Sequence, residues 1–251
     1  MALDWAGKRR FYIIGGAALI ALVLLAGILI AVMYEAPSCM DGKQNQDENG
    51  IDCGGSCAYL CSADVEPARV PFARALMNLS GRTDLIAYVE NRNALAEAKN
   101  ASYVAEIFDA QGRLLGTREG IVDLPARAIV PVFVPGIGAG GAARAFLTIA
   151  ETTKWRLPSN VKEPLAVGTV SMIQGEKARV TAPVENLSPR DEFDRTVIAV
   201  VFNANGEAVA ATQTVLRVVS AFGKTDAVFT WNEPFPEGAL RAEVRIVPRL
   251  P

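Results

Sequence analysis

One uncharged run of 24 residues constrains this chain more than any other feature of its sequence. It extends from Phe11 to Tyr34 and reads FYIIGGAALIALVLLAGILIAVMY. As a helix rising about 1.5 Å per residue it would be roughly 36 Å long, enough to cross a hydrocarbon core of about 30 Å. A buried helix of a soluble protein rarely has this length without a polar face. The run therefore predicts a transmembrane helix over residues 11–34, with the lipid bilayer as its partner.

The residues on either side of the run predict its orientation. Lys8, Arg9 and Arg10 directly precede it, whereas the acidic Glu35 follows it. Basic residues beside a span remain on the cytoplasmic side. We therefore expect a cytoplasmic tail over residues 1–10, and a C-terminal part that faces away from the cytoplasm in a single-pass protein of the cell membrane.

A cleaved signal peptide is the alternative interpretation of the same run. The apolar region of a signal peptide has about 7–15 residues and ends in small residues before the cut. The run here is longer, and a cut after Ala36 would leave Pro37 as the first mature residue. An uncleaved anchor is the favoured interpretation.

Charge and composition exclude several classes of function. The part that follows the run holds 22 of the 25 basic and 26 of the 27 acidic residues, a net charge of −4. This near balance offers no basic surface for nucleic acid. The chain contains no histidine, which excludes Ser-His-Asp and Cys-His catalysis and metal sites built on histidine.

Three short patterns match catalytic motifs by letter and fail on context. GIGAGG at 136–141 satisfies GxGxxG, but Pro135 interrupts the preceding strand and no βαβ pattern surrounds it, so we expect a loop there. Ser159–Lys162 fits SxxK without the companion motifs of serine acyl-enzymes. Gly223–Thr225 has the ending of a phosphate loop, but Val218 stands where its first glycine belongs. Both are interpreted as turn residues.

All four cysteines lie within one short segment, which we expect to form a disulfide-rich stalk over residues 35–64. They are Cys39, Cys53, Cys57 and Cys61. Outside the cytoplasm four clustered cysteines predict two disulfides. Three pairings are open, and the sequence does not choose among them. A zinc site is the competing interpretation, but such sites favour CxxC pairs, and the spacings here are thirteen, three and three intervening residues.

An acidic stretch between the first two cysteines resembles the opening of a calcium loop. Oxygen-bearing residues alternate before and after a glycine, at Asn45, Asp47, Asn49 and Asp52. A calcium loop has ligands at positions 1, 3 and 5, glycine at 6 and a bidentate glutamate at 12. Ser56 stands at position 12, so Asp52 would have to replace the glutamate. The alternative is a disulfide-stapled series of Asx turns that needs no ion.

The whole segment resembles a short Cys-rich motif that recurs in bacterial surface proteins. The shared pattern is C-x-DG-x-x-N-x-x-E-x-G-x-DCGG-x-C-x-x-x-C, carried here from Cys39 to Cys61. Its place directly after a single span is similar to that in uncharacterised membrane-anchored proteins of candidate-phylum (Parcubacteria-like) bacteria. This resemblance implies surface location and no particular activity.

From about Val65 onward the pattern is that of short strands separated by turns. Segments rich in β-branched and aromatic residues alternate with Gly, Pro and Asn signals, as strands do. The expected strands of the first half are Thr83–Glu90, Tyr103–Phe108, Arg113–Thr117, Ala128–Val134 and Ala143–Ile149.

The order of motifs then recurs in the second half. Val89-Glu90-Asn91 is matched by Val184-Glu185-Asn186, and the turn Phe108–Gly112 is matched by Phe202–Gly206. The distance from the asparagine to the glycine is 21 residues in the first copy and 20 in the second. This recurrence predicts two tandem β-sandwiches, over residues 66–155 and 162–251. The order of strands and turns also resembles FxLYD-like and Ig-like envelope modules.

Two further groups in the second half invite a functional interpretation. Trp231 has no counterpart in the first copy, and we interpret it as a core or inter-strand aromatic rather than a ligand platform. Asp191, Glu192 and Asp194 cluster after Ser188. Paired carboxylates serve glycosidases, but a loop between strands is their ordinary place.

The sequence therefore predicts a mainly β protein with an N-terminal transmembrane helix, a short disulfide-rich segment and two tandem Ig-like β-sandwiches. We expect an extracytoplasmic binding or structural protein without catalytic activity, whose partner is another envelope or surface protein. One alternative is an accessory subunit of an envelope secretion or pilus assembly. The other is a hydrolase that uses carboxylates or a metal instead of histidine.

Overall fold

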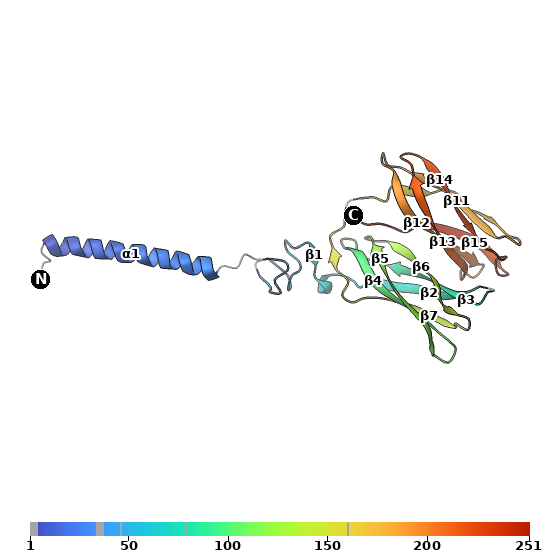
Figure 1. Cartoon of the computed structure of the whole chain (residues 1–251), viewed down its shortest axis with the longest axis horizontal. Helices are drawn as coiled ribbons and strands as arrows, with labels where there is room; N and C mark the ends of the chain where they lie inside the picture. Colours follow the sequence, from blue (N-terminus) through green and yellow to red (C-terminus); the bar gives the residue numbers. More distant parts are fainter. Residues whose placement is uncertain (1–4, 34–37, 46, 79, 160) are drawn as a thin grey trace. The chain divides into compact units, whose positions relative to one another are not determined.

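The computed structural model describes residues 5–33, 38–45, 47–78, 80–159 and 161–251. The chain divides into two compact units, one up to residue 56 and one from residue 57 onward, and each is described by itself. Figure 1 labels the elements in chain order. Strands make up 49% of the chain and helix 13%, which confirms the expected mainly β class.

The first unit begins with α1, a helix over Trp5–Met33. It starts earlier than the predicted span and includes the basic residues Lys8–Arg10, while Tyr34 lies outside the described residues. Within Gly7–Met33 a window of 18 residues has a mean hydropathy of 2.9, and none of that window is buried in the protein. A helix that is apolar on all sides and unburied is long enough to cross a membrane, although a signal sequence meets the same test of length and composition.

The cysteine segment after the helix folds into tight turns. All four cysteines are disulfide-bonded, so none offers the free thiolate that a zinc site requires. In the first unit a short antiparallel bridge joins Gly50 to Cys53. Gly55 has a φ of +56°, and a Cβ there would lie 2.0 Å from the backbone oxygen of Asp47. Glycine is therefore required at this position of the DCGG motif.

The second unit contains two pairs of antiparallel sheets (Figure 1), and the first pair encloses one apolar core. One sheet has the strand order β2 (Arg69–Met77), β3 (Arg82–Glu90) and β6 (Ile129–Ala139). The other contains β1 (Tyr59–Leu60), β8 (Trp155–Arg156), β4 (Glu97–Phe108), β5 (Leu114–Leu124) and β7 (Arg144–Ile149). A single 3₁₀ turn, Ser62–Asp64, precedes β2. Leu85, Ile107 and Leu124 are fully buried in the core between the sheets.

The second pair of sheets encloses a separate core. One sheet has the order β10 (Ser171–Ile173), β11 (Arg179–Asn186) and β14 (Lys224–Thr230), with β9 (Leu165–Val167) also paired to β11. The other has the order β13 (Ala208–Val219), β12 (Glu192–Asn203) and β15 (Ala239–Ile246). Buried and less buried residues alternate strictly along the second half of β11, as expected for a strand with one face on a core.

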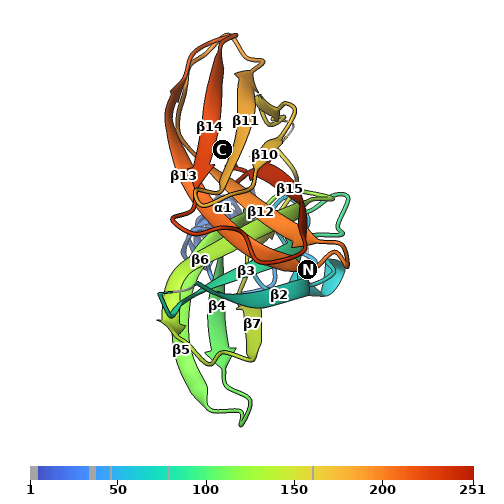
Figure 2. The same cartoon turned by 90° about the vertical axis from the view of Figure 1, so that its right-hand side faces the viewer.

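A third apolar cluster joins the two sandwiches. Figure 2 shows the sheet of β12, β13 and β15 next to that of β2, β3 and β6. Ile86 of β3 and Phe133 of β6 pack there with residues of β12 and β13. The central strands β3 and β12 are buried on both faces, because alternate residues of each point into its own core and into this shared cluster. The second unit therefore packs as one body.

Tyr88 lies at this interface with a buried hydroxyl that makes no hydrogen bond of normal geometry among the described residues, although the guanidinium of Arg245 lies 5.8 Å from the centre of its ring. Burial, followed by the charge of Glu243, raises the pKa of Tyr88 to about 12. An acid whose pKa is raised on folding stabilises the fold below its unfolded pKa of about 10, and this contribution is lost as pH rises toward 12.

We expect Tyr88→Phe to leave the free energy of unfolding at pH 7 unchanged or to raise it by about 1 kcal/mol, because the substitution removes an unsatisfied buried hydroxyl. The variant should also lose less stability between pH 10 and 12 than the original protein. Urea unfolding at both pH values measures both effects. A clear destabilisation by Tyr88→Phe at pH 7 would contradict this assignment.

Candidate functional site

The residues proposed for calcium lie in the turns of the first unit. The carboxylate of Asp52 accepts hydrogen bonds from the backbone N–H groups of Asp41 at 2.9 Å and Gly42 at 3.1 Å. Asp41 in turn accepts the N–H of Lys43 at 2.9 Å, and this bond lowers the pKa of Asp41. Such bonds from a side chain to nearby backbone are those of Asx turns.

The other three positions have separate roles in the same turns. Asn45 donates from its side chain to the carboxylate of Asp41 at 2.8 Å. Asp47 accepts the hydroxyl of Ser56 at 3.0 Å. The side chain of Asn49 lies directly beside Gly54, where a Cβ would be only 2.7 Å away. Asp52 accepts backbone N–H groups and Asp47 accepts one hydroxyl. Calcium binding by Asn45, Asp47, Asn49 and Asp52 stays a prediction.

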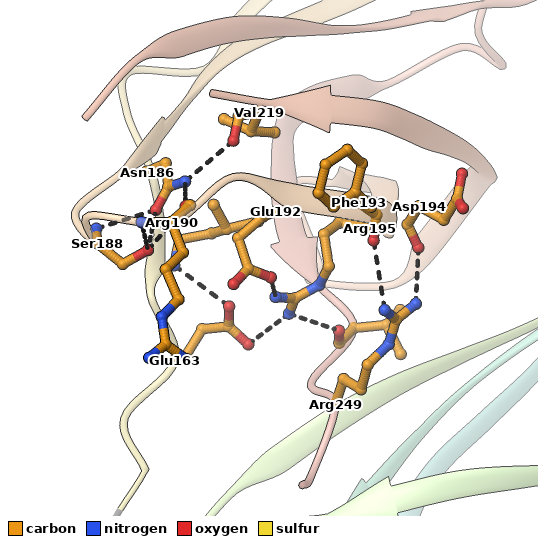
Figure 3. Close-up of polar contacts among 12 residues, drawn as sticks. Glu163, Asn186, Ser188, Arg190, Glu192, Phe193, Asp194, Arg195, Val219 and Arg249 are labelled. Carbon is orange, nitrogen blue, oxygen red and sulfur yellow. Dashed lines mark hydrogen bonds and ion pairs between the residues drawn. The ribbon is translucent and has the colours of Figure 1, made fainter. Parts of the chain in front are cut away.

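The acidic cluster of the second half is organised around a buried arginine (Figure 3). The Arg195 side chain is 3% exposed and forms ion pairs with Glu163 and Glu192, both at 2.7 Å. It also donates to the backbone oxygen of Val247. Burial opposes the charge of the guanidinium, but the hydrogen bonds and charges of the two glutamates raise the pKa of Arg195 above its ordinary value.

The two aspartates of the cluster are exposed and differ in their contacts. Asp191 accepts the N–H of Ala221 at 2.8 Å. Asp194 has a φ of +48°, and its backbone oxygen accepts a hydrogen bond from Arg249 at 2.9 Å (Figure 3). Arg195, Glu163 and Glu192, with the backbone contacts of Val247 and Arg249, therefore form a network that joins β12 to the segments before β9 and after β15.

The other short motifs also have structural roles. The expected loop at 136–141 is wrong for its first residues, because β6 continues to Ala139. Gly138 lies in this strand against Ile107, where a Cβ would be 2.7 Å from that side chain. Ser159 donates to the buried Glu97 at 3.2 Å. Lys224 begins β14 and pairs with Glu185 at 3.3 Å.

The recurring asparagines are buried and make equivalent hydrogen bonds. The side-chain nitrogen of Asn91 donates to the backbone oxygen of Leu124 at 3.2 Å, and that of Asn186 donates to Val219 at 3.0 Å, each 33 residues along the chain. Each side-chain oxygen accepts the N–H two residues further on. The turns at Asp109 and Asn203 match in the same way, since each side chain accepts N–H groups two and four residues ahead.

A groove between the two sandwiches is lined by the segment around Trp231. Its volume is about 320 Å³, and both Asp84 of the first sandwich and Trp231 of the second line it. Trp231 is half-buried against the second core and makes an edge-to-face contact with Phe235 at 4.8 Å between ring centres. This placement agrees with its interpretation as a core aromatic.

Comparison with known proteins does not place the chain in a family. No protein-family model matches the chain, and no curated protein matches it in sequence. Red sea bream transglutaminase is similar in structure, with 16% identity and a TM-score of 0.26 over 72% of this chain and 29% of that one. A β-glucuronidase of glycoside hydrolase family 2 has 11% identity and a TM-score of 0.24, over 62% of this chain and 20% of that one. The tandem CBM22 domain of Paenibacillus barcinonensis Xyn10C has 11% identity and a TM-score of 0.14, over 73% of this chain and 84% of that one. Scores this low carry no argument about function.

Proposed function

We propose that this chain is a membrane-anchored, extracytoplasmic binding and structural protein that presents two β-sandwiches as one body. The observation that carries the proposal is the third apolar cluster, in which Ile86 of one sandwich packs with Ile198 and Phe202 of the other. Because both central strands are buried on both faces, rotation of one sandwich against the other would expose apolar surface. A body held in this way presents its loops and grooves in a fixed arrangement to a partner.

Anchoring through residues 11–34 is supported by the apolar helix and by the bonded cysteines. The helix is long enough to cross a bilayer, and disulfides are typical of proteins outside the cytoplasm. The basic residues Lys8, Arg9 and Arg10 support a cytoplasmic N-terminus. The partner in this proposal is a second envelope or surface protein.

The absence of catalytic activity is part of the proposal. A general base needs a pKa near the working pH, which histidine supplies most readily, and this chain has none. Of the three clustered carboxylates, Glu192 forms an ion pair with Arg195 and Asp191 accepts a backbone N–H group, so that Asp194 alone of the three has no partner for its carboxylate among the described residues. The cluster therefore lacks the two available carboxyl groups, one acting as acid and one as base or nucleophile, that glycoside hydrolysis requires.

We also propose that the two sandwiches are copies of one module. The buried Asn91 and Asn186 make hydrogen bonds of the same pattern over the same sequence distance. Asp109 and Asn203 organise the following hairpin turns alike. Each copy then has the same buried anchor at the end of one strand and the same turn in the next hairpin.

Membrane extraction and limited proteolysis test the anchor and the topology. The chain, expressed with an epitope tag at its C-terminus, should remain in membranes washed with alkaline carbonate and leave them in detergent, because an apolar helix stays in lipid. Protease added to spheroplasts should remove the tag. The matched control replaces Leu22 and Leu25 by arginine, which should release the chain from membranes. Full protection of the tag would contradict the topology, and an N-terminus beginning after residue 36 would contradict the anchor.

A further inference from the structure

A polar cavity of about 330 Å³ lies on the first sandwich, away from the groove beside Trp231. Three of its lining residues are cationic, namely Lys99, Lys154 and Arg156, and none is acidic. Tyr59, Ser102 and two threonines add hydroxyl groups to the lining. A cavity of this size lies at the lower end of the range of small-molecule sites.

A β-bulge in β4 brings Lys99 and Asn100 to one side of the cavity. Ala98 of β4 pairs with Leu124 and Ala101 pairs with Val122, so Lys99 and Asn100 together oppose the single residue Asp123. Asn100 has a φ of +54°, and its N–H donates to the Asp123 carboxylate at 2.7 Å. Bulges of this kind redirect side chains and are common beside functional sites.

The positive charge of the cavity comes from its two lysines. Arg156 is neutralised by the buried Glu97, whose carboxylate it contacts at 2.9 Å. The ammonium group of Lys154 lies over the ring of Tyr59 at 5.1 Å, which leaves its charge in place. No described residue forms an ion pair with Lys99 or Lys154. The acidic residue nearest to Lys154 along the chain, Glu151, precedes the lining residue Thr152 and is exposed to solvent. Two exposed lysines without an ion pair therefore line this polar cavity, whose own lining contains no carboxylate.

We propose that this cavity binds a small acidic saccharide, with Lys99 and Lys154 contacting its carboxylate or phosphate group. Ammonium groups form charge-assisted hydrogen bonds to such oxyanions. The side chains of Asn100, Ser102 and Thr152 then pair with the sugar hydroxyls, and the Thr153 hydroxyl, which donates to the backbone oxygen of Ala150 at 2.6 Å, can accept a further hydrogen bond. A bare inorganic ion would leave most of the cavity unfilled. The inference rests on the binding function proposed above and names a ligand class for it.

Calorimetric titration of the full chain tests the proposal, in a detergent without a sugar headgroup. The probes are glucuronate, glucose 6-phosphate, glycerol 3-phosphate, neutral glucose and inorganic phosphate. We expect binding of glucuronate or glucose 6-phosphate, at least tenfold weaker binding of glucose, and an affinity that falls with added salt. Glucuronate and glucose 6-phosphate distinguish the carboxylate from the phosphate. Glycerol 3-phosphate binding as tightly as both sugar acids would overturn the saccharide assignment in favour of a lipid-type headgroup.

Variants separate the site from general electrostatics. Lys99→Ala with Lys154→Ala should weaken binding at least tenfold, since both ionic hydrogen bonds are lost. Lys162→Ala with Lys177→Ala removes the same charge outside the cavity and should leave affinity within twofold. Equal losses in the two double variants, or binding of inorganic phosphate alone, would overturn the proposal. Such a failure would leave the membrane and protease results of the anchor test unchanged, so the two proposals fail separately.

Discussion

An Arg195→Ala variant is expected to lose about 3–5 kcal/mol in free energy of unfolding, because the change leaves two carboxylates without their buried partner. The arginine side chain is 3% exposed and contacts Glu163 and Glu192, both at 2.7 Å. Glu163 precedes β9, whereas Glu192 begins β12. The two ion pairs therefore connect β12 to the segment before β9. Hydrogen exchange of the full chain in detergent should show faster exchange in β9, β12 and β15, with β2 to β7 little changed.

Two controls separate the unpaired charges from a simple loss of packing. Arg195→Met combined with Glu163→Gln and Glu192→Gln removes all three charges and should recover most of the lost stability. Arg190→Ala removes an exposed arginine from the turn before β12 and should change the free energy of unfolding by less than about 0.5 kcal/mol. Equal losses of free energy of unfolding in Arg195→Ala and in the triple variant would show that the packing of the Arg195 side chain, and not its ion pairs, stabilises this part of the second sandwich.

Asn91→Ala should cost about 2–4 kcal/mol, the second largest effect that we expect. The side-chain nitrogen donates to three backbone oxygens, those of Ala96, Leu124 and Pro125, at 2.8–3.2 Å. Each buried acceptor that loses its donor costs about 1–3 kcal/mol, and the three losses are not fully additive. Asn186→Ala should have a somewhat smaller effect on the second sandwich, because Asn186 donates to two oxygens.

Asn205→Ala is the matched control for both asparagines. Asn205 is exposed, and only its backbone N–H takes part in a hydrogen bond. The Asn205→Ala substitution should change the free energy of unfolding, measured by urea titration, by less than about 0.5 kcal/mol. If Asn91→Ala is as mild as Asn205→Ala, the buried asparagines are not the anchors that their hydrogen bonds indicate. If only one of the pair is costly, their equivalence is lost.

The sequence-based predictions that the structure confirms all rest on patterns of residues close together in the chain. An uncharged run predicted a helix because composition alone decides whether a segment is apolar on every side. The turn at Asp109 was recognised because an Asx side chain and a glycine act on adjacent backbone, and Gly112 adopts the expected positive φ of +83°. Strand positions followed from β-branched residues between turns, although β4 and β5 are longer than predicted.

The predictions that failed or were missing depend on contacts between distant residues. Gly138 lies in a strand because β6 pairs with β3 at this point, where Thr83 is opposite Gly138. Glu192 forms an ion pair with Arg195 of the same strand, and the network is completed by Glu163, which reaches Arg195 from the segment before β9. The cavity of Lys99 and Lys154 escaped the sequence analysis entirely. The two lysines are 55 positions apart and are brought together by the bulge in β4 and by β8.

The sequence by itself determined the apolar helix, the oxidised cysteine segment and the β character of the rest, since each depends on composition or on short-range spacing. Only the tertiary structure decided how the sandwiches associate. The runs Leu85–Val89 and Val197–Phe202 lack the polar positions of a half-exposed strand, which is typical of burial on both faces. A pattern of this kind indicates that both faces of the strand are covered, but it does not indicate which segment of the chain covers the second face. The partner became known when Ile86 and Phe202 were found in one cluster, because burial is settled by the packing of whole sheets.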